Sequence, residues 1–570
     1  MNQTRSFLLI AWLLVATLLW MEWNKGPVPA ETATPTTSTV PAAPAAPLVA
    51  PGAEALPNSL PAPGLSATPA ATAAASAEPI VLQNDVLKLT VDLHGGRLID
   101  SQLLAYTLEK KPDSPRVSLL SADPAHYFSA TAGLLRADAQ QREQLLDETF
   151  RTEDGRRSYV LPDGAQALTV PLLWTDPGTG LEVRRTLTLT RGSYVLGLSE
   201  QVSNRGSSAQ RVYPYNELER VAPPAPAKHS SLTNPESFSF IGAAWYSPQD
   251  KFEKTKFDAF AKQAPLNKAV TGGWVAMLQH HFVAAWVPAP GQAQVFSLRS
   301  DSRNGVPVYR IRSVSAPLDL AAGTTQTRDS RLWVGPKLQA PLERLAPGLK
   351  LTLDYGIFTF IAQPLFDYVL KPLHYLTGNW GWAIILTVVI LKLLLYPLSA
   401  AQYKSTAKMR AVQPRIEALK ERYGQDKQQF QIAMMELYKK EKINPVGGCL
   451  PMLIPIPIFF ALYWVLLETV ELRHAAWMGW VQNLTDADPY FILPALNLLV
   501  MYLTQKLTPT PGMDPMQKKM MQFMPLVFGV MMAFFPAGLV LYWVTNGALG
   551  LLQQWWVTKQ HGTQAVAVAK

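Results

Sequence analysis

The chain has 570 residues, of which 48% are hydrophobic and only 16% are charged, whereas soluble globular chains carry about 25% charged residues. A purely soluble protein is therefore excluded, and most of the charge deficit lies after residue 380. The single cysteine, Cys449, excludes a disulfide scaffold, a zinc site built on cysteines and a dithiol redox centre. The net charge of +9 would suit a nucleic-acid-binding protein, but the position of the basic residues gives it another explanation.

Residues 1–26 have the pattern of a membrane anchor. Arg5 precedes an uncharged run over 6–21, and Trp20 and Trp23 stand where small residues would precede a cleavage site. Bulky aromatic side chains suit the membrane interface better than a peptidase. We therefore expect an uncleaved signal anchor, with a cleaved signal as the alternative.

Residues 27–345 fall into two parts that differ in composition and patterning. Residues 27–79 contain twelve Pro among Ala, Thr and Ser, a composition that cannot bury a core and predicts a disordered tether. From residue 80 onward, apolar and polar residues alternate with period two, most clearly over 86–91, 181–190 and 194–202. Turn residues separate these runs, and no long helical pattern appears before about residue 340. Residues 80–345 are predicted to form one large all-β sandwich.

This β-domain offers few candidates for chemistry, and no catalytic residue, metal site or cofactor is predicted. Glu217 and Glu219 could form a carboxylate pair in a sugar cleft, but a solvated edge strand with alternating charge is the preferred interpretation. Adjacent residues on a strand face opposite ways, so His280 and His281 are not expected to share a metal ion. The run beginning at His94 is expected to be a turn.

Residues 346–378 are apolar with a narrow polar stripe. Pro364 and Pro372 would break a long helix. Short helical pieces lying in the outer membrane interface are therefore predicted, with a packed linker helix as the alternative.

Five apolar segments in the last third of the chain approach the ~20 residues that cross a bilayer. They are 379–399, 446–470, 489–505, 520–535 and 537–558. The last two come from one 39-residue uncharged stretch, which is too long for one span and is broken near Pro536. Together with the anchor, they predict a multi-pass α-helical membrane protein of six spans with a large extracytoplasmic β-domain.

Loop charges orient these spans, because Lys and Arg in short loops stay in the cytoplasm. The N-terminus, segment 400–445, loop 506–519 and tail 559–570 together hold sixteen Lys and Arg against six Asp and Glu. The connecting loop 471–489 holds a single Lys or Arg, which is Arg473. Both termini are predicted to be cytoplasmic, and the basic excess is explained as a topology signal.

Segment 400–445 is polar and has the pattern of a cytoplasmic helical hairpin. Apolar residues spaced alternately three and four apart from Met409 to Tyr423 predict one helix with a packing seam. Gly424 would end that helix, and Asp426 would cap a second. Basic residues on the outer face include Lys408, Arg410, Arg415, Lys420 and Arg422. These charges either only set the topology or form a docking surface for ribosomal RNA, anionic lipid or a partner protein.

Lys392 is the charge within the second span, about 9 Å from its cytoplasmic end at 1.5 Å per residue. A lysine at that depth costs roughly 2.5–3.5 kcal/mol and usually faces a hydrated cavity, although its stem can also reach the membrane surface. Polar residues in the spans that favour a hydrated interior are Thr387, Asn497, Gln522, Tyr542, Thr545 and Asn546. A cavity with a cation and no deep carboxylate would attract acidic or polar segments of a passing chain.

Several motifs occur in a fixed order along the chain. They are Asn379–Trp382 (NWGW), Tyr396–Leu398 (YPL), Ala401–Tyr403 (AQY), Asn444–Cys449 (NPVGGC), Pro457–Phe459 (PIF), Phe535–Trp543 (FPAGLVLYW) and, in the outer domain, Gly273–Pro288 and Leu332–Pro336. With them the chain resembles the YidC–Oxa–Alb family of membrane protein insertases, in the long form of Gram-negative inner membranes. The resemblance covers nearly the whole chain except the tether and the extreme C-terminus.

The resemblance implies a five-helix insertase core around a hydrophilic groove open to the cytoplasm and to lipid, with an outer domain that is a β-supersandwich. A positive charge in the groove would receive the polar outer segment of a client, and Lys392 stands where the family typically has arginine. Phe459 and Trp543 take the positions of groove-side client contacts, and Thr387 and Tyr542 are expected to line the same groove.

We interpret the chain as a membrane protein insertase and folding chaperone rather than an enzyme, with no cofactor, metal or nucleotide. The partners that the resemblance implies are nascent membrane proteins, the ribosome, the Sec translocon and the lipid bilayer of the bacterial inner membrane. A solute transporter with a sugar-binding outer domain is the alternative, but it predicts paired broken helices in corresponding halves, and the single hairpin insertion argues against it. A third alternative, an envelope enzyme with a β-sandwich head, lacks a catalytic constellation.

Overall fold

The structure is a computed structural model that describes residues 78–111, 113–137, 143–223, 239–260, 266–423, 426–441, 455–507 and 515–568. The predicted anchor and all but the last two residues of the predicted tether lie outside the described residues. Two compact units divide the chain. One contains the β-domain and most helices (Pro61–Arg410 and Pro445–Lys570), and the other contains the hairpin (Ala411–Asn444) together with Met1–Leu60.

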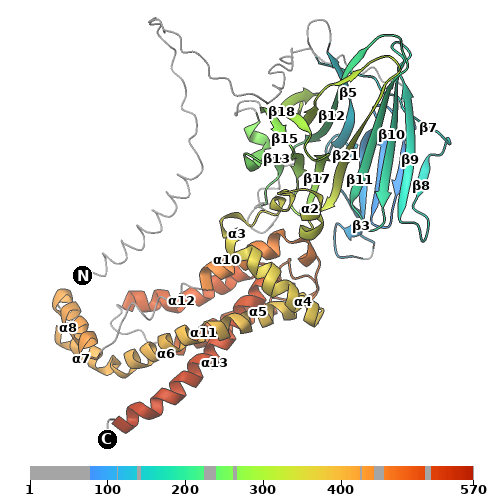
Figure 1. Cartoon of the computed structure of the whole chain (residues 1–570). Helices are drawn as coiled ribbons and strands as arrows, with labels where there is room; N and C mark the ends of the chain where they lie inside the picture. Colours follow the sequence, from blue (N-terminus) through green and yellow to red (C-terminus); the bar gives the residue numbers. More distant parts are fainter. Residues whose placement is uncertain are drawn as a thin grey trace, which may run out of the picture. The chain divides into compact units, whose positions relative to one another are not determined.

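The first sheet of the β-domain has twelve strands within the described residues (Figure 1). Its main path runs through β15 (Asn267–Thr271), β18 (Ala293–Arg303), β19 (Val306–Ser315), β12 (Gln210–Val221), β5 (Phe128–Ala137), β3 (Arg97–Thr107), β2 (Leu87–Asp92), β1 (Ile80–Gln83) and β8 (Ser158–Val160). Three short strands, β20 (Leu318–Leu320), β4 (Arg116–Ser118) and β6 (Glu143–Leu145), pair with β12, β3 and β5. Neighbours are antiparallel except β1 and β8, which run parallel.

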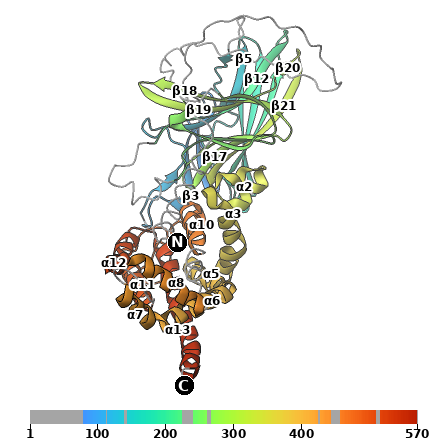
Figure 2. The same ribbon diagram turned by 90° about the vertical axis from the view of Figure 1, so that its left-hand side faces the viewer.

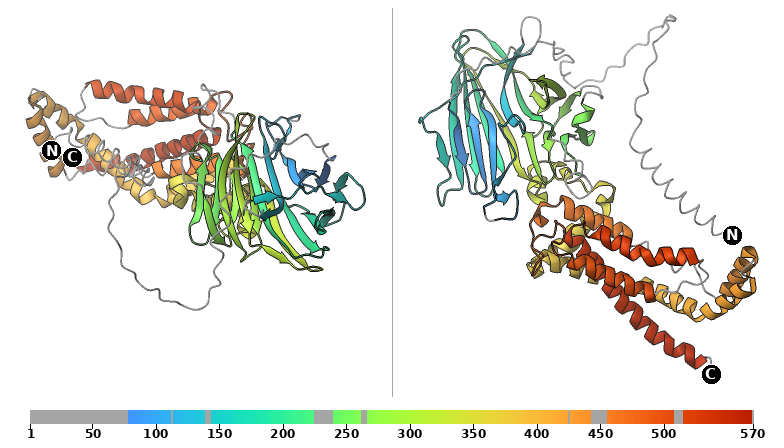
Figure 3. Two further views of the ribbon diagram at one scale, coloured as in Figure 1. Left: turned by 90° about the horizontal axis from the view of Figure 1, so that it is seen from above. Right: turned by 180° about the vertical axis from the view of Figure 1, so that it is seen from behind.

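The second sheet has nine strands in the described part of the chain, and Figures 2 and 3 show it as a separate layer from the first. Its order is β14 (Lys251–Lys256), β13 (Gly242–Ser247), β16 (Trp274–Leu278), β17 (Phe282–Pro288), β21 (Thr325–Pro336), β11 (Val195–Asn204), β10 (Leu181–Thr190), β9 (Ala167–Thr175) and β7 (Arg151–Thr152). A 3-10 turn, η2 (Phe257–Ala259), follows β14. Strand β10 shows why the alternation was informative, because every second side chain from Leu181 to Leu189 is buried in the core. The prediction of a β-sandwich is confirmed.

A chain of short helices follows the last strand. It consists of α2 (Gln339–Leu345), η3 (Leu349–Thr352), η4 (Gly356–Phe358), α3 (Thr359–Pro364), η5 (Leu365–Leu370) and α4 (Lys371–Thr377). The predicted short helical pieces occur, and α3 ends at Pro364, but they follow one another without a break because the chain stays helical from Thr359 to Thr377. The π-helical turn η5 follows Pro364, and Pro372 is the second residue of α4.

The described part of the C-terminal third is helical over most of the predicted spans, and residues 446–454 of one predicted span lie outside the described residues. Its helices are α5 (Trp380–Leu394), α6 (Tyr396–Ala411), α10 (Pro455–Glu468), α11 (Ile492–Leu507), α12 (Pro515–Met532) and α13 (Ala537–Val568), with a 3-10 turn η7 (Val470–Leu472) after α10. Among the described residues, no one helix meets the length and hydropathy expected of a span, whereas α5 and the first half of α6 meet them together across a bend of 67°. The predicted break near Pro536 separates α12 from α13.

The start of α5 explains the NWGW motif. The Asn379 side chain accepts hydrogen bonds from the backbone N–H groups of Gly381 and Trp382, at 2.9 and 3.2 Å, and so caps the helix. Its amide donates to the carbonyl of Trp477 at 2.8 Å. A Cβ atom on residue 381 would lie 2.2 Å from the Trp477 ring, so only glycine fits there. The motif therefore joins α5 to the loop that precedes α11.

The hairpin unit contains α7 (Gln413–Tyr423) and α8 (Lys427–Lys440). Asp426 caps α8 as predicted, accepting from the N–H groups of Gln428 and Gln429. The predicted single helix from Met409 to Tyr423 is wrong, because the chain turns at Val412, just before Pro414, and Met409 belongs to α6. The predicted turn residue Gly424 lies outside the described residues.

The β-domain holds the outer end of α10 through buried polar contacts. Lys337, which follows β21, and Glu468, the last residue of α10, are each 2% exposed, and their charged groups lie 3.8 Å apart. The Ser239 hydroxyl donates to the same carboxylate at 2.6 Å. One residue further on, Thr469 and Tyr355 are hydrogen-bonded at 3.1 Å through their hydroxyls. Burial lowers the pKa of the Lys337 ammonium, and Glu468 opposes that shift.

This pair generates a stability prediction. Lys337→Met or Glu468→Leu alone leaves an uncompensated buried charge and should cost about 3–5 kcal/mol, whereas the double variant should return close to wild type. The measurement is thermal unfolding of the purified full chain in detergent. Lys254→Met, which breaks the more exposed pair with Asp354, is the matched control and should cost at most about 1 kcal/mol. Additive losses in the double variant would show that the two charges do not depend on each other.

Candidate functional site

Lys392 lines a small polar cavity between α5, α6, α10 and α13. The cavity has a volume of about 60 Å³, enough for only a few water molecules. Its polar lining residues are Lys392, Ser399, Gln402, Tyr403, Tyr542 and Asn546, and the others are aliphatic. The described part of the lining contains no carboxylate, so its one full charge is positive.

The bend between α5 and α6 and a glycine on α13 create this geometry. Because α6 turns by 67° after Leu395, Tyr403 reaches α13, and its hydroxyl donates to the carbonyl of Gly550 at 3.1 Å. A Cβ atom on residue 550 would lie 3.5 Å from the Lys392 ammonium and 3.4 Å from the Tyr403 hydroxyl. Both polar groups therefore approach the surface of α13 where it lacks a side chain.

A second cavity, of about 380 Å³, also has Lys392 in its lining. Its other walls come from α5, α13 and the first residue of α6, and they are almost entirely apolar. Trp555 and Trp556 in these walls are 56% and 53% exposed. Lys392 therefore stands between a polar cavity inside the helices and a more open apolar one.

The other predicted groove residues divide into two groups. Tyr542 and Asn546 line the polar cavity beside Lys392. Thr387 does not line it, because its side chain is buried and its hydroxyl donates to the Ala383 carbonyl of its own helix at 2.8 Å. Thr545 likewise donates within its helix, to Leu541.

Phe459 and Trp543 lie against each other, on α10 and α13. Their ring centroids are 5.1 Å apart, and the Phe459 ring is 6.4 Å from that of Tyr542. Phe459 is buried, so this aromatic cluster forms a wall next to the cavity rather than an open surface. Two other residues predicted to face a hydrated interior do not line either cavity: Asn497 is buried and Gln522 is exposed.

No groove role was predicted for Ser399, Gln402, Tyr403 and Gly550, although Gln402 and Tyr403 belong to the AQY motif. The signal for the first three was Pro397, which cannot continue α5 with regular hydrogen bonding, so the chain had to bend next to Lys392. Nothing local marked Gly550, because its partners lie about 150 residues earlier.

The predicted basic surface of the hairpin is described only in part. Arg415 is ion-paired with Glu441 at 2.5 Å, and Lys420 and Arg422 are exposed on α7. The side chains of Lys408 and Arg410 lie outside the described part of the structure.

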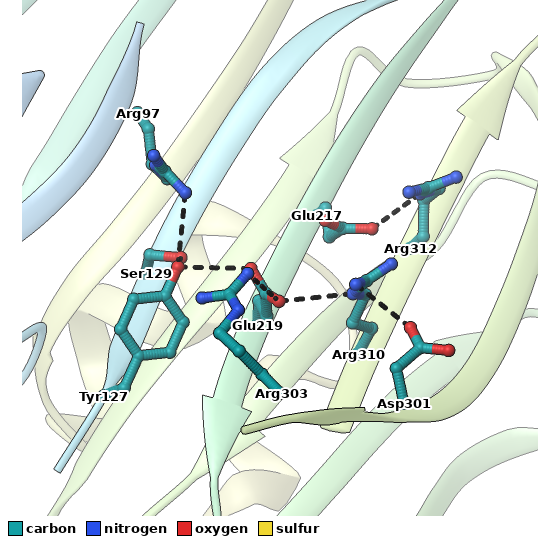
Figure 4. Close-up of polar contacts among 9 residues, drawn as sticks. All are labelled: Arg97, Tyr127, Ser129, Glu217, Glu219, Asp301, Arg303, Arg310 and Arg312. Atoms are coloured by element: carbon teal, nitrogen blue, oxygen red, sulfur yellow. Dashed lines mark hydrogen bonds and ion pairs between the residues drawn. The ribbon is translucent and has the colours of Figure 1, made fainter. Parts of the chain in front are cut away.

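The carboxylates of β12 correct the interpretation of a solvated edge strand. Strand β12 lies between β19 and β5, and Glu217 and Glu219 are only 8% and 7% exposed. Figure 4 shows that both side chains are bound to arginines. Glu217 accepts from Arg312 at 2.6 Å, and Glu219 accepts from Arg303 at 3.1 Å.

Further donors surround Glu219, including Arg310 at 3.3 Å and the Tyr127 hydroxyl at 3.2 Å. Each oxygen of the Glu219 carboxylate thus already accepts a hydrogen bond from another side chain. The cluster therefore ties the strands together and gives no support to sugar chemistry.

His280 and His281 correct a second interpretation, because they lie in the turn between β16 and β17 and not on a strand. Their rings stack with centroids 3.7 Å apart, and both Nε2 atoms donate to the carbonyl of Leu467 on α10, at 2.7 and 2.9 Å. Burial and the nearby positive charges lower the pKa of His281 well below its usual value. Within the described residues, no group of three metal-ligating side chains occurs.

Comparisons with known proteins match both halves of the chain. The family model of the YidC periplasmic domain matches residues 79–368, and that of the 60Kd inner membrane protein matches residues 372–564. A membrane protein insertase YidC of Stenotrophomonas maltophilia (strain R551-3) is 50% identical over 99% of this chain and 98% of its own. One of Xanthomonas campestris pv. campestris (strain 8004) is 51% identical with the same coverage. The chain belongs to the YidC family of membrane protein insertases.

Membership of the YidC family rests on these sequence relatives. A crystal structure of an active YidC insertase with its first transmembrane domain resolved covers 84% of this chain and 92% of its own, at 18% identity and a TM-score of 0.37. A galactose mutarotase-like protein from Lactobacillus casei covers 45% of this chain and 100% of its own, at 10% identity and a TM-score of 0.31. At these TM-scores neither structure adds to the argument. YidC family members are insertases and not enzymes.

Gly550 generates a prediction for this YidC relative. Alanine at position 550 meets its neighbours at ordinary contact distances, so Gly550→Ala should keep client insertion within about twofold. Gly550→Leu must displace the Lys392 ammonium or the Tyr403 hydroxyl and should reduce insertion about tenfold, the effect of roughly 1.4 kcal/mol. The measurement is protease protection of a translocated client segment at equal expression. Full activity of the leucine variant would mean that the position of Lys392 beside α13 is not required.

Proposed function

We propose that this chain inserts integral membrane proteins into the inner membrane and assists their folding, with the polar outer segment of each client entering at Lys392. The observation that supports this proposal is the position of Lys392 between a polar cavity and an open apolar one. A client has the same two parts, a hydrophilic segment that must cross and an apolar span that must enter lipid. The polar cavity would take the first, and the apolar face would lead the second into the bilayer.

The energy for this process comes from the client. Burying an apolar span in lipid is favourable, while carrying a charged segment through hydrocarbon is costly. A hydrated cation lowers the second term without any nucleotide. At an effective dielectric near 20, a unit charge pair ~4 Å apart is worth about 4 kcal/mol before desolvation, which matters for a marginal step.

The proposed architecture has six spans, namely the N-terminal anchor and a five-helix core formed by α5, α10, α11, α12 and α13, around a groove open to the cytoplasm. Both termini would be cytoplasmic and the β-domain periplasmic, since the loops rich in Lys and Arg remain inside. The exposed Lys420 and Arg422 support a docking role for the hairpin. The proposed partners are nascent membrane proteins, the ribosome and the Sec translocon, without nucleotide.

The orientation predicts which sites impermeant thiol reagents reach in intact spheroplasts. In a Cys449→Ser background, a cysteine at the exposed Gln482 should label because its loop faces outward. A cysteine at the exposed Glu421 should label only after the membrane is permeabilised. The reverse pattern would contradict the orientation.

The Lys392 proposal predicts a dependence on client charge. Lys392→Arg should be tolerated, Lys392→Ala should reduce insertion most for clients with acidic outer segments, and Lys392→Glu should be worse than alanine for those clients because attraction becomes repulsion of similar size. The measurement is protease protection of outer segments in a client series that differs only in charge.

A lysine that merely reaches the membrane surface predicts another pattern. Alanine would then be neutral, and glutamate would harm all clients through misfolding. Equal activity of wild type and Lys392→Ala across the client series would eliminate the electrostatic role.

A further inference from the structure

A large cavity lies between the β-domain and the outer ends of α10 and α11, away from Lys392. Its volume is about 750 Å³, within the range of small-ligand sites. Four separate parts of the chain form its walls: the loop after β3, the turn that carries His280 and His281, the end of α10, and the long loop between η7 and α11.

The lining of this outer cavity is basic. It contains Lys110, Lys111 and Arg473 together with three imidazoles, against two carboxylates, Glu109 and Asp486. Glu109 is ion-paired with Lys111 at 2.6 Å, and Asp486 accepts from the Asn483 amide at 2.7 Å. The described carboxylates of the lining therefore already have partners, and the fixed charges leave one positive charge in excess.

The basic groups also hold the cavity open. Arg473 donates to the carbonyls of Thr107 and Leu108 at 2.7 and 2.9 Å, and Lys110 donates to the carbonyl of Gln482. These bonds join the β3 loop to the α10–α11 loop on either side of the cavity. The residue after Arg473, His474, has a left-handed backbone with φ of 59°, an unusual conformation for a residue with a side chain.

The lowered pKa values of two histidines in the lining agree with a positive electrostatic potential in the outer cavity. Burial and the charge of Arg473 lower the pKa of His474, and burial, His280 and Arg473 lower that of His281. A bound anion would relieve the same repulsion that these shifts report.

Exposed apolar side chains continue from one wall of the cavity into α11. Tyr490, Phe491 and Ile492 are 69%, 54% and 43% exposed, and Leu496, one turn further along α11, is 42% exposed. In the proposed orientation, this rim lies where the headgroups of the outer leaflet meet the hydrocarbon. A basic pocket next to an apolar rim matches a ligand with a negative headgroup and acyl chains.

We infer that the outer cavity binds the phosphate headgroup of an outer-leaflet phospholipid, with its acyl chains along the Tyr490–Ile492 rim. The inference rests on the proposed membrane orientation but not on client insertion, so binding can fail while insertion stands. The shared chemistry is a phosphate ester, which a soluble phosphate could also supply.

The test uses the purified full chain in detergent and measures the shift of its unfolding temperature with added ligand. The ligands are dihexanoyl phosphatidylglycerol, glycerol phosphate and an acidic peptide of equal charge. The test variant is Lys111→Gln on the exposed loop after β3, which leaves the bond from Lys110 to the Gln482 carbonyl in place. The control is Lys256→Gln on β14, an exposed lysine outside the cavity lining with the same change of charge.

Phosphatidylglycerol should stabilise wild type and Lys256→Gln equally. The affinity of the test variant should fall about fivefold, as expected for the removal of one basic residue near anionic lipid. Equal binding by the test variant and the control would overturn the site. Saturation by glycerol phosphate at the same concentration would overturn the lipid source in favour of a soluble phosphate. Binding of the acidic peptide alone, lost in the test variant, would overturn the ligand class.

Discussion

The buried contact between Lys337 and Glu468 is the constraint on which the joining of the two folds depends. Two charges that are each 2% exposed are costly to desolvate, and they persist only with good geometry and additional donors. Ser239 supplies one such donor to the carboxylate, and the two imidazoles of His280 and His281 hold the neighbouring carbonyl of Leu467. The end of α10 is therefore fixed by a mainly polar set of contacts with directional geometry, which defines the rotation and depth of the helix as well as its attachment. Phe459 lies on α10, so the β-domain also constrains the aromatic wall beside the polar cavity that Lys392 lines.

The basic side chains of this protein differ in whether carboxylates lie beside them. In the β-domain, the buried Arg185 is bound by Glu148 and Glu200, at 3.0 and 2.7 Å, so its charge is neutralised within the core. The arginines around Glu217 and Glu219 are neutralised in the same way. The lining of the two cavities has less compensation, since no carboxylate is described beside Lys392 and basic groups outnumber acidic ones in the outer cavity. Among these groups, the cavity linings hold positive charge in excess, whereas the arginines beside Glu148, Glu200, Glu217 and Glu219 are neutralised.

Local features of the sequence predicted the helices and strands. The surroundings of the site residues, by contrast, depend on contacts with residues far away in the sequence. Alternation over 181–190 and the cap at Asp426 depend on neighbouring residues, so both predictions were correct. Whether β12 is an edge strand depends on β5 and β19, which lie about 80 to 100 residues away, and the pattern of β12 alone could not decide it. His280 and His281 were misplaced for a related reason, because a two-residue shift of a strand end moves both from opposite faces into one turn. Lys392 was found by the cost of its charge in an apolar span, whereas its polar neighbours required the bend after Leu395.

The small volume of the polar cavity that Lys392 lines limits how a client could enter it. A cavity of about 60 Å³ is too small for a peptide segment, so the proposed entry of a client at Lys392 requires α6 or α13 to shift. The described contact that joins these helices beside Lys392 is the hydrogen bond from Tyr403 to the Gly550 carbonyl, and a bond of this kind is worth about 1 kcal/mol net. Gly550 adds no side chain to that contact. By contrast, the outer end of α10 is held by a buried ion pair whose rupture costs several kcal/mol. The polar contact beside Lys392 is therefore weaker than the one at the β-domain end, and in the proposed mechanism a client that enters from the cytoplasmic side meets the weaker polar contact first.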